Sequence, residues 1–264
     1  MALRRLDAEL VRRKMLRSRD AARAAIQAGQ VTVNGFVITK PARQVQESDA
    51  ITVTEQAESR WASRAAHKLL GALETFHSIK VAGKTCLDAG ASTGGFTDVL
   101  LDRDAAKVYA VDVGYGQLIW RLQSDARVVV KDRFNVRNLT ADDLGESVDI
   151  VVADLSFISL RTVLPALKAV SKPEADLILM VKPQFEVGKD KLGKSGVVRD
   201  APLRIDAVNA VSKAAADLGL GTYGVAASPL PGPSGNVEYF LWLRHGTHRI
   251  GEDEVAQAVA NGPQ

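Results

Sequence analysis

The segment from Cys86 to Thr97 constrains the fold of this chain more than any other. An apolar run ends in Asp88, a turn of small residues with three glycines follows, and a helical pattern begins at Phe96. Glycines let a backbone approach a ligand where a Cβ atom would block it, and the next helix directs free N–H groups toward that ligand. A second apolar run, residues 107–111, ends in Asp112. This layout is typical of a nucleotide pocket at the carboxyl ends of parallel strands, where the acid binds ribose hydroxyls.

The spacing within the turn narrows the kind of ligand. Gly90, Gly94 and Gly95 do not form the Gly-x-Gly-x-x-Gly pattern of dinucleotide enzymes, which disfavours a dehydrogenase. The spacing is closer to the loop with which methyltransferases hold S-adenosylmethionine. Any strand–turn–helix connection of an α/β protein can carry glycines, so the loop alone leaves the identity of the ligand open.

Composition limits the cellular setting. The 264 residues include a single cysteine, Cys86, so no intrachain disulfide can form, which fits a reducing cytoplasm. No run approaches about 18 consecutive apolar residues, and Asp7 and Glu9 follow Arg4 and Arg5 with no apolar signal core. We therefore expect a cytoplasmic protein with no membrane partner and no metal site.

The charge is distributed unevenly along the chain. Residues 1–43 contain ten Lys or Arg against three Asp or Glu, a net charge of +7, whereas the remainder carries −4. Such an asymmetry indicates a basic module that meets a polyanion, although arginine-rich helix faces are often only solvated.

The basic region has the pattern of a small α+β module. Residues 4–26 show two helical segments, with Ser18 as a natural N-cap for the second and Gly29 as a stop. The strands 31–33 and 36–38 flank Asn34-Gly35, a strong hairpin signal, and 50–53 predicts another strand.

This pattern, from Arg5-Leu6-Asp7 through Gly29–Gly35 to Lys40-Pro41, resembles the small RNA-binding fold known as the S-four domain. The resemblance implies that basic side chains of the module contact RNA phosphates, namely Arg4, Arg5, Arg17, Arg19, Arg23 and Lys40. A folded RNA is then recognised largely by shape.

The rest of the chain predicts a larger domain. We assign residues 1–56 to the RNA-binding domain, 57–62 to a linker that contains Trp61, and 63–264 to a second domain. In that domain seven apolar runs alternate with helical patterns, which indicates a Rossmann-like α/β fold with a seven-stranded, mostly parallel sheet. The short connection between the last two strands favours an antiparallel edge. We expect Trp61 to dock onto one of the domains.

Polar residues gather where these strands end or begin. Asp154 ends the run 148–153, Lys182 ends the run 176–181, and Glu238 opens the last strand, while Lys68 lies off the apolar stripe of the helix before the first strand. Each one alone could be a solvated strand end. Together, at one edge of a sheet, they predict a catalytic site.

These four residues resemble the Lys-Asp-Lys-Glu set of the RrmJ/FtsJ class of RNA 2′-O-methyltransferases, in the same chain order. With the amino-terminal module and the phrases at 181–189 and 228–236, residues 4–244 are similar to the TlyA family. That family is known as haemolysins and as ribosomal RNA cytidine 2′-O-methyltransferases. The resemblance implies Lys68, Asp154, Lys182 and Glu238 as catalytic residues, ribosomal RNA within ribosomal subunits as the partner, and an effect on sensitivity to ribosome-binding peptide antibiotics.

The resemblance also implies S-adenosyl-L-methionine as the cofactor. Asp112 is expected on its ribose and Asp132 near its adenine. The full set of expected cofactor contacts is Asp88, Gly90, Ser92, Gly94, Gly95, Phe96, Asp112 and Asp132. Phe96 could equally be ordinary helix core. Further phosphate contacts are expected from Arg64, Arg133, Arg137 and Lys189, the last in a glycine- and lysine-rich segment.

The chemistry of the four residues is left open at this stage. A free lysine has a pKa near ~10.4, too high for a good base at neutral pH. If burial and Lys68 dominate, Lys182 can act as a base; if Asp154 and Glu238 dominate, the lysines stay charged and stabilise a developing alkoxide. Two other functions also compete: an RNA-binding assembly factor, and a membrane-lytic haemolysin, which the absence of an amphipathic membrane helix disfavours.

The basic module generates a first prediction. If its side chains bind phosphates, the logarithm of the RNA affinity falls linearly with the logarithm of salt concentration, by about 0.7 to 0.9 per phosphate contacted. Filter binding of the full-length protein to ribosomal RNA, between about 50 and 200 mM salt, measures this slope. An affinity that does not change with salt would contradict the phosphate contacts.

Overall fold

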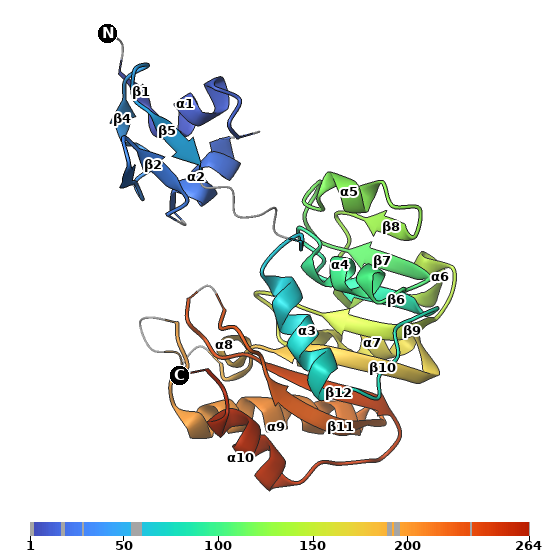
Figure 1. Cartoon of the computed structure of the whole chain (residues 1–264). Helices are drawn as coiled ribbons and strands as arrows, with labels where there is room; N and C mark the ends of the chain where they lie inside the picture. Colours follow the sequence, from blue (N-terminus) through green and yellow to red (C-terminus); the bar gives the residue numbers. More distant parts are fainter. Residues whose placement is uncertain are drawn as a thin grey trace. The chain divides into compact units, whose positions relative to one another are not determined.

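The computed structural model describes residues 3–16, 19–27, 29–53, 60–188, 192, 196–232 and 234–263. The chain divides into two compact units, residues 1–60 and 61–264 (Figure 1). Residues 57–59 of the segment that was expected to link them lie outside the described residues, as do Arg17, Ser18 and Lys189.

The amino-terminal unit is a small α+β fold. Helices α1 (Leu6–Arg12) and α2 (Arg19–Gln27) share a core with a three-stranded antiparallel sheet, whose order is β3 (Phe36–Val37), β2 (Val31–Val33) and β5 (Ile51–Val53). The predicted hairpin is present, since β2 pairs with β3 in antiparallel register. Asn34 and Gly35 both have positive φ, 52° and 83°, as a type I′ turn requires. An additional pair, β1 (Arg4–Arg5) with β4 (Gln44–Val45), was not predicted, since two residues carry no periodicity.

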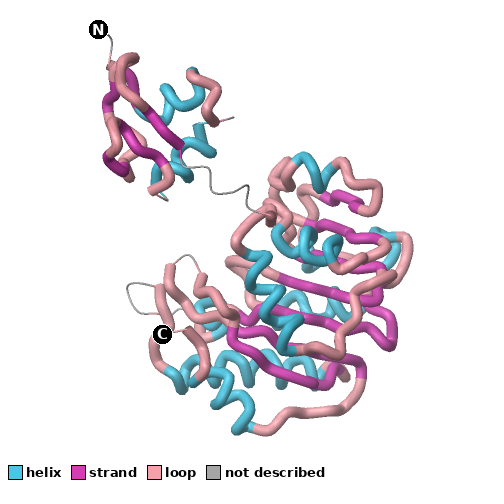
Figure 2. Tube along the Cα trace, viewed as in Figure 1, coloured by secondary structure: helices cyan, strands magenta, loops and turns pink. Residues whose placement is uncertain are grey.

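The larger unit contains the expected seven-stranded sheet. Its strands are drawn in magenta in Figure 2. Its spatial order is β11 (Leu220–Ala227), β12 (Tyr239–His245), β10 (Ser171–Val181), β9 (Val148–Ala153), β6 (Thr85–Ala89), β7 (Lys107–Val111) and β8 (Val128–Lys131). All neighbours pair in parallel except β12, which runs antiparallel to both β10 and β11. The antiparallel pair β11–β12 therefore forms one edge, and the Rossmann-like prediction is confirmed.

Helices cover both faces of this sheet, which explains why its strands are continuous apolar runs. Along β6 the side chains alternate, with Cys86 in one core cluster and Leu87 in the other. Helix α3 (Ala65–Thr75) precedes the first strand of the sheet. The elements between its strands are α4 (Gly95–Asp102), α5 (Trp120–Gln123), the 3-10 turn η1 (Val136–Asn138), α6 (Ala141–Leu144), α7 (Leu160–Ala169), α8 (Pro183–Glu186) and α9 (Ala201–Asp217).

A last helix, α10 (Glu252–Ala260), lies in a part of the sequence from which we predicted no structure. Its N-terminus is held by the Gly251 N–H, which donates to Glu254 at 3.0 Å. Val255 and Val259 are buried in the same core cluster as the inner strands. The helix was missed because its apolar face consists of few residues in a polar background.

The strand order changes direction between β6 and β9, so the two halves of the sheet extend to opposite sides of this point. In open α/β sheets the ligand crevice lies outside the carboxyl ends of the strands at such a switch point. Among the described residues no helix is long and apolar enough to cross a membrane.

Trp61 packs, half-buried, against the core cluster of the larger unit. The Ala62 N–H donates to Asp98 on α4 at 2.7 Å. The start of this unit is thereby attached to the helix that follows the glycine turn.

Gly94 generates a prediction for stability. It precedes α4 with a φ of 101°, and a Cβ atom there would lie 2.7 Å from Leu118 Cδ1 and would overlap Leu122 as well. Gly94→Ala should lower the free energy of unfolding by about 1–2 kcal/mol for the left-handed backbone and by about 1–3 kcal/mol more for the displaced leucines. Urea denaturation measures both.

Gly83→Ala is the matched control, since Gly83 also has a positive φ, 73°, but has open space around it. Only the backbone cost is expected there. Equal losses for the two variants would show that Leu118 and Leu122 do not crowd the turn.

Candidate active site

The glycine turn forms the floor of the site. Gly90, Ser92 and Gly94 have positive φ values of 87°, 48° and 101°, so the chain folds tightly between β6 and α4. A Cβ atom at Gly90 would lie 2.7 Å from the backbone oxygen of Asp154, where β9 ends. The turn thus needs glycine at this position because it lies directly against the neighbouring strand end.

Asp112, at the end of β7, fastens the turn. Its two carboxylate oxygens accept the N–H groups of Ser92 at 2.8 Å and Gly114 at 2.7 Å. A carboxylate offers about four acceptor positions, so Asp112 retains capacity for further donors such as ribose hydroxyls.

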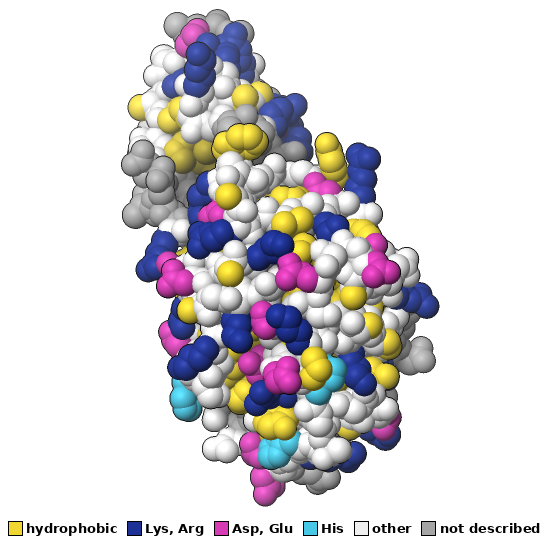
Figure 3. Space-filling model, turned by 90° about the vertical axis from the view of Figure 1, so that its right-hand side faces the viewer, with side chains coloured by type: hydrophobic (Ala, Val, Ile, Leu, Met, Phe, Trp, Pro, Cys, Tyr) yellow, Lys and Arg dark blue, Asp and Glu magenta, His cyan; other side chains and the backbone are white. Residues whose placement is uncertain are grey.

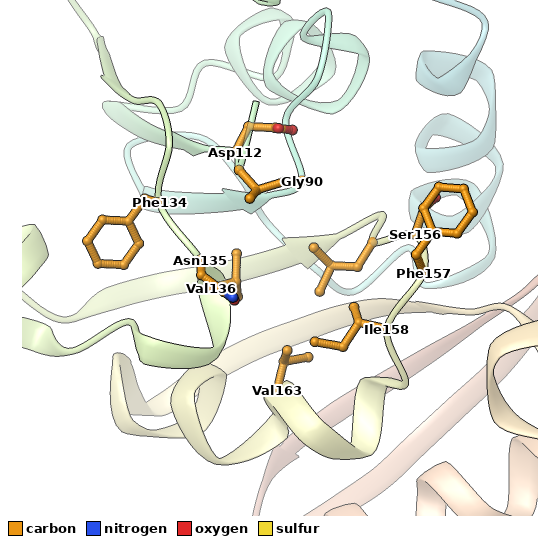
Figure 4. Close-up of a pocket in the computed structure, with 11 residues that line it drawn as sticks. Gly90, Asp112, Phe134, Asn135, Val136, Ser156, Phe157, Ile158 and Val163 are labelled. Atoms are coloured by element: carbon orange, nitrogen blue, oxygen red, sulfur yellow. The ribbon is translucent and has the colours of Figure 1, made fainter. Parts of the chain in front are cut away.

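Two cavities meet at this turn. The first, of about 240 Å³, is lined by Asp112 on one side and by Phe134, Asn135 and Val136 on the other (Figure 4). The second, of about 290 Å³, is lined by residues of α3, the glycine turn and the ends of β9 and β10, among them Lys68, Phe96, Asp154 and Lys182. Gly90 and Ser156 line both, so the two cavities adjoin.

The four predicted catalytic residues form two ion pairs beside the second cavity. Lys68 Nζ lies 2.5 Å from Glu238 Oε2, and Lys182 Nζ lies 2.6 Å from Asp154 Oδ1. The side chains of Lys68 and Glu238 are 6% and 1% exposed, those of Lys182 and Asp154 9% and 18%. Buried charges of this kind require close partners, and breaking such a pair by removing one member is strongly destabilising.

The surroundings of Glu238 explain how it reaches Lys68. The loop before β12 closes over the carboxylate, and a Cβ atom at Gly232 would lie 2.7 Å from Glu238 Oε1. The same loop contacts α3, because Arg64 donates to the carbonyl of Pro231 at 2.5 Å and Gly71 faces the ring of Pro229. The helix of Lys68 and the strand of Glu238 are therefore held together on both sides of the ion pair.

Ser156 is a site residue that sequence analysis did not find. Lys182 Nζ donates to its hydroxyl at 2.9 Å, so the ammonium is held between Ser156 and Asp154. Nothing in the sequence distinguishes this serine, because it lies in a loop without periodicity. Its position two residues after Asp154 is the one available signal.

The expected cofactor residues separate into two groups. Gly90 lines both cavities, Asp112 lines the first, and Ser92, Gly95 and Phe96 line the second. Phe96 also packs against Phe240. Gly94 lies against the leucines of the α5 region instead.

Asp88 and Asp132 do not line either cavity. Asp88 is fully buried and accepts the N–H and hydroxyl of Thr97 at 2.8 and 2.7 Å, so it positions the turn from beneath. Asp132 accepts the Gly116 N–H at 2.8 Å, and it is Asn135, three residues later, that lines the first cavity.

The basic residues of the amino-terminal unit are organised by two buried acids. Asp7 contacts Arg5, Arg19 and Arg23 within 3.4 Å. The guanidinium groups of Arg5 and Arg19 hold the pKa of its carboxyl well below the usual range. Arg12 and Arg13 likewise lower the pKa of Glu9 to about 2, and Arg4 lies 3.7 Å from the same carboxylate. Sequence analysis did not show that these two acids arrange the arginines.

The remaining predicted RNA contacts lie at the surface. Lys40 and Arg137 are exposed, Arg64 lines the second cavity, and Arg133 stacks over the ring of Tyr115 at 4.2 Å. In the view of Figure 3, Lys and Arg side chains gather on the amino-terminal unit and are mixed with acids over the larger one. Within the described ranges no cluster of three metal-ligating side chains is present.

Phe157 is a further residue that sequence analysis missed. Its side chain is 92% exposed at the rim of the first cavity, its φ is 64°, and its ring lies 5.4 Å from that of Phe185. A positive φ in a bulky residue is a strained conformation that tends to occur at functional sites.

Known proteins share this architecture. The FtsJ-like methyltransferase family matches residues 61–245, and the S4 domain matches residues 4–51. The chain is 58% identical to the 16S/23S rRNA (cytidine-2′-O)-methyltransferase TlyA of Mycobacterium tuberculosis, with 98% of each chain covered.

The chain belongs to the TlyA family. It is therefore a methyltransferase with an S4-type RNA-binding module. Another TlyA relative, Hemolysin A of Brachyspira hyodysenteriae, is 37% identical over 89% of this chain and 97% of its own. A solved structure of a hemolysin-named protein from Streptococcus thermophilus superimposes with a TM-score of 0.77 at 32% identity, covering 98% of this chain and 95% of that one.

Asp88 generates a prediction for pH dependence. Burial, with smaller contributions from Asp154 and Asp112, raises the pKa of its carboxyl to about 7. The native state thus keeps a proton that the unfolded chain releases near pH 4, and the free energy of unfolding falls as pH rises from about 4 to about 7. Asp88→Asn removes this titration.

Between pH 5 and 8 the stability of the variant should therefore rise relative to wild type by about 2 to 3 kcal/mol. Urea denaturation at both pH values measures the difference. Parallel pH profiles for the two proteins would show that Asp88 does not titrate in this range.

Proposed function

We propose that this TlyA-family protein transfers a methyl group from S-adenosylmethionine to the 2′-hydroxyl of a cytidine in ribosomal RNA. The observation that supports this most is the pair of buried ion pairs, Lys68–Glu238 and Lys182–Asp154, beside a cavity that shares its floor with the glycine turn. The choice of cytidine as the target nucleotide follows the name of the Mycobacterium tuberculosis relative. The proposal extends to ribosomal subunits as the substrate and to sensitivity toward ribosome-binding peptide antibiotics.

The residues around the first cavity fit a nucleoside-containing cofactor. Asp112 offers spare acceptor positions for ribose hydroxyls, and the apolar side chains of Phe134, Val136 and Ile158 supply surfaces for an adenine ring. Gly90 lines both cavities, and because it has no side chain its backbone is accessible to a ligand where the cavities meet. When bound, S-adenosylmethionine supplies a sulfonium methyl group as the electrophile. The cavity of Lys68 and Lys182 would then receive the nucleophile.

The ion pairs set the role of the lysines. Each ammonium touches a carboxylate, so its charge is compensated within the buried site. A ribose 2′-hydroxyl becomes negative as it releases its proton to water during attack, and a fixed ammonium a hydrogen bond away stabilises that charge. We assign this role to Lys182, with Asp154 and Ser156 holding its Nζ in place. Lys68, paired with Glu238, lines the same cavity.

Alignment of the ribose hydroxyl with the methyl group also accelerates the transfer. A hydroxyl held against the methyl group reacts as if it were at a very high local concentration. The amino-terminal unit would provide affinity and register through phosphate contacts, since its arginines are pre-arranged around Asp7 and Glu9. Arg64, Arg133, Arg137 and Lys189 remain proposals for contacts closer to the reacting nucleotide.

Lys182 generates the prediction that tests this function. Methyl transfer from tritiated S-adenosylmethionine to isolated ribosomal subunits should place label at an alkali-resistant position, as 2′-O-methylation requires. Lys182→Ala should reduce the rate by about 100-fold or more, the scale of losing one fixed group that stabilises an oxyanion.

Lys172→Ala is the matched control. Lys172 lies on the same strand, β10, and pairs with Asp149 at 2.9 Å, but it does not line either of the two cavities at the glycine turn. Its variant should retain wild-type transfer. Absence of label on either subunit with wild-type protein would contradict the proposed function.

A further inference from the structure

Glu186 is a buried carboxylate that has no role in the function proposed above. It lies at the end of α8, the single helical turn that begins directly after Lys182, and its side chain is 1% exposed. A buried carboxylate is unfavourable unless its oxygens meet donors, so those donors identify what it holds. Within the described part of the chain, the donors to this side chain lie in one segment, residues 159–161.

The contacts of Glu186 fasten the start of α7. One carboxylate oxygen accepts the Leu160 N–H at 2.7 Å, and the other accepts the Ser159 hydroxyl at 2.6 Å. Arg161 donates from Nε to the carboxylate and from a terminal nitrogen to the Glu186 carbonyl, both at 3.1 Å. A helix leaves its first N–H groups without partners, so Glu186 supplies from α8 an acceptor that α7 lacks.

The loop that ends at this contact carries both partners of Lys182 Nζ. It runs from Asp154, where β9 ends, to the start of α7, and Ser156 lies within it. The sheet holds the first end of the loop, since the Asp154 N–H donates to the carbonyl of Ala89 on β6 at 3.1 Å. Glu186 holds the other end. The position of Ser156 between these two ends therefore depends on both attachments.

A contact between two rings also joins this loop to α8. Phe157 directly follows Ser156, and its ring centroid lies 5.4 Å from that of Phe185, the residue before Glu186. Phe157 has a φ of 64°, and such a strained backbone persists only where the surrounding structure determines it. The contacts of Phe185 and Glu186 supply that support from α8.

We infer that Glu186 is a positioning residue for methyl transfer, which holds the loop of Asp154 and Ser156 against α8 so that both side chains meet Lys182 Nζ. Lys182 and Glu186 lie at the two ends of one helical turn, so the carboxylate fixes the loop relative to the ammonium. Glu186 does not line either of the two cavities at the glycine turn. Its effect on transfer passes through Lys182, an inference that rests on the proposed function.

The test measures the effect of Glu186→Ala with and without Lys182. In the otherwise wild-type protein it should lower the single-turnover rate on ribosomal subunits by about 10- to 100-fold, the scale of a displacement of about 1 Å at a reacting group. The affinities for the subunits and for S-adenosylmethionine should stay close to those of wild type. In a Lys182→Ala protein the same change should lower the residual rate by less than about twofold, because no ammonium remains to be positioned.

Glu186→Gln separates the position of the loop from the charge. Glutamine has the same length as glutamate and an oxygen that can accept the Leu160 N–H, so this variant should recover most of the rate lost in Glu186→Ala. Urea denaturation of each variant shows that the protein assayed is folded.

Asp143→Ala is the matched control. Asp143 also accepts an N–H and a hydroxyl at the start of a helix, both from Thr140, at 2.9 and 2.6 Å. Its helix, α6, precedes the start of β9, whereas the site lies where β9 ends. This variant should keep the wild-type rate of transfer.

A folded Glu186→Ala protein that transfers methyl groups at the wild-type rate would overturn the inference, while wild-type activity would still support the proposed function. An equal fold-loss with and without Lys182 would also overturn it. If Glu186→Ala does not fold, Ser159→Ala makes the same comparison by removing one donor, and it should lower the rate only where Lys182 is present. Wild-type protein that labels neither subunit would contradict the proposed function itself.

Discussion

The ion pair between Lys68 and Glu238 is the contact on which the rest of the site depends. It joins a helix that precedes the first strand of the larger unit to a strand near its end, 170 residues apart in sequence. Both side chains are almost completely buried, so neither charge can exist there without the other. The glycine turn and the residues of the second ion pair lie between Lys68 and Glu238 in the sequence. The contact therefore joins the two ends of the chain segment that contains the site.

The sheet explains why a second pair forms beside the first. Strands β6, β9 and β10 are parallel neighbours, so Gly90, Asp154 and Lys182 emerge at the same edge. Strand β12 runs the opposite way, and this reversal brings Glu238, at its start, to the edge where the other strands end. One antiparallel strand therefore completes a cluster that six parallel strands could only partly supply.

Much of this site could be predicted from strand ends. Asp112, Asp154, Lys182 and Glu238 each follow or precede a long apolar run, and such runs are visible because both faces of the sheet are covered. The family resemblance, not periodicity, selected Lys68 from its helix. Residues in loops gave no comparable signal, which is why Ser156 and Phe157 were missed.

The depth of a side chain could not be predicted either. Asp88 was expected to contact the cofactor; the structure shows its carboxylate buried beneath the turn, where it binds Thr97, and spacing along the chain cannot reveal that position. Asp132 has the same position relative to its strand as Asp112, yet it turns toward Gly116. In the amino-terminal unit, Asp7 and Glu9 lower the net charge, but they also hold the arginines in place through ion pairs. A count of charges along the sequence cannot show this arrangement.

The most direct test of the Lys68–Glu238 claim separates cofactor binding from methyl transfer. Glu238→Gln keeps the shape of the side chain and an acceptor for Lys68 but removes the negative charge that compensates the buried ammonium. Calorimetry with S-adenosylmethionine and single-turnover transfer to ribosomal subunits are measured on the same preparation. We expect cofactor affinity to remain close to that of wild type while transfer falls by about 100-fold. Wild-type transfer rates in the variant would contradict a catalytic role for this ion pair.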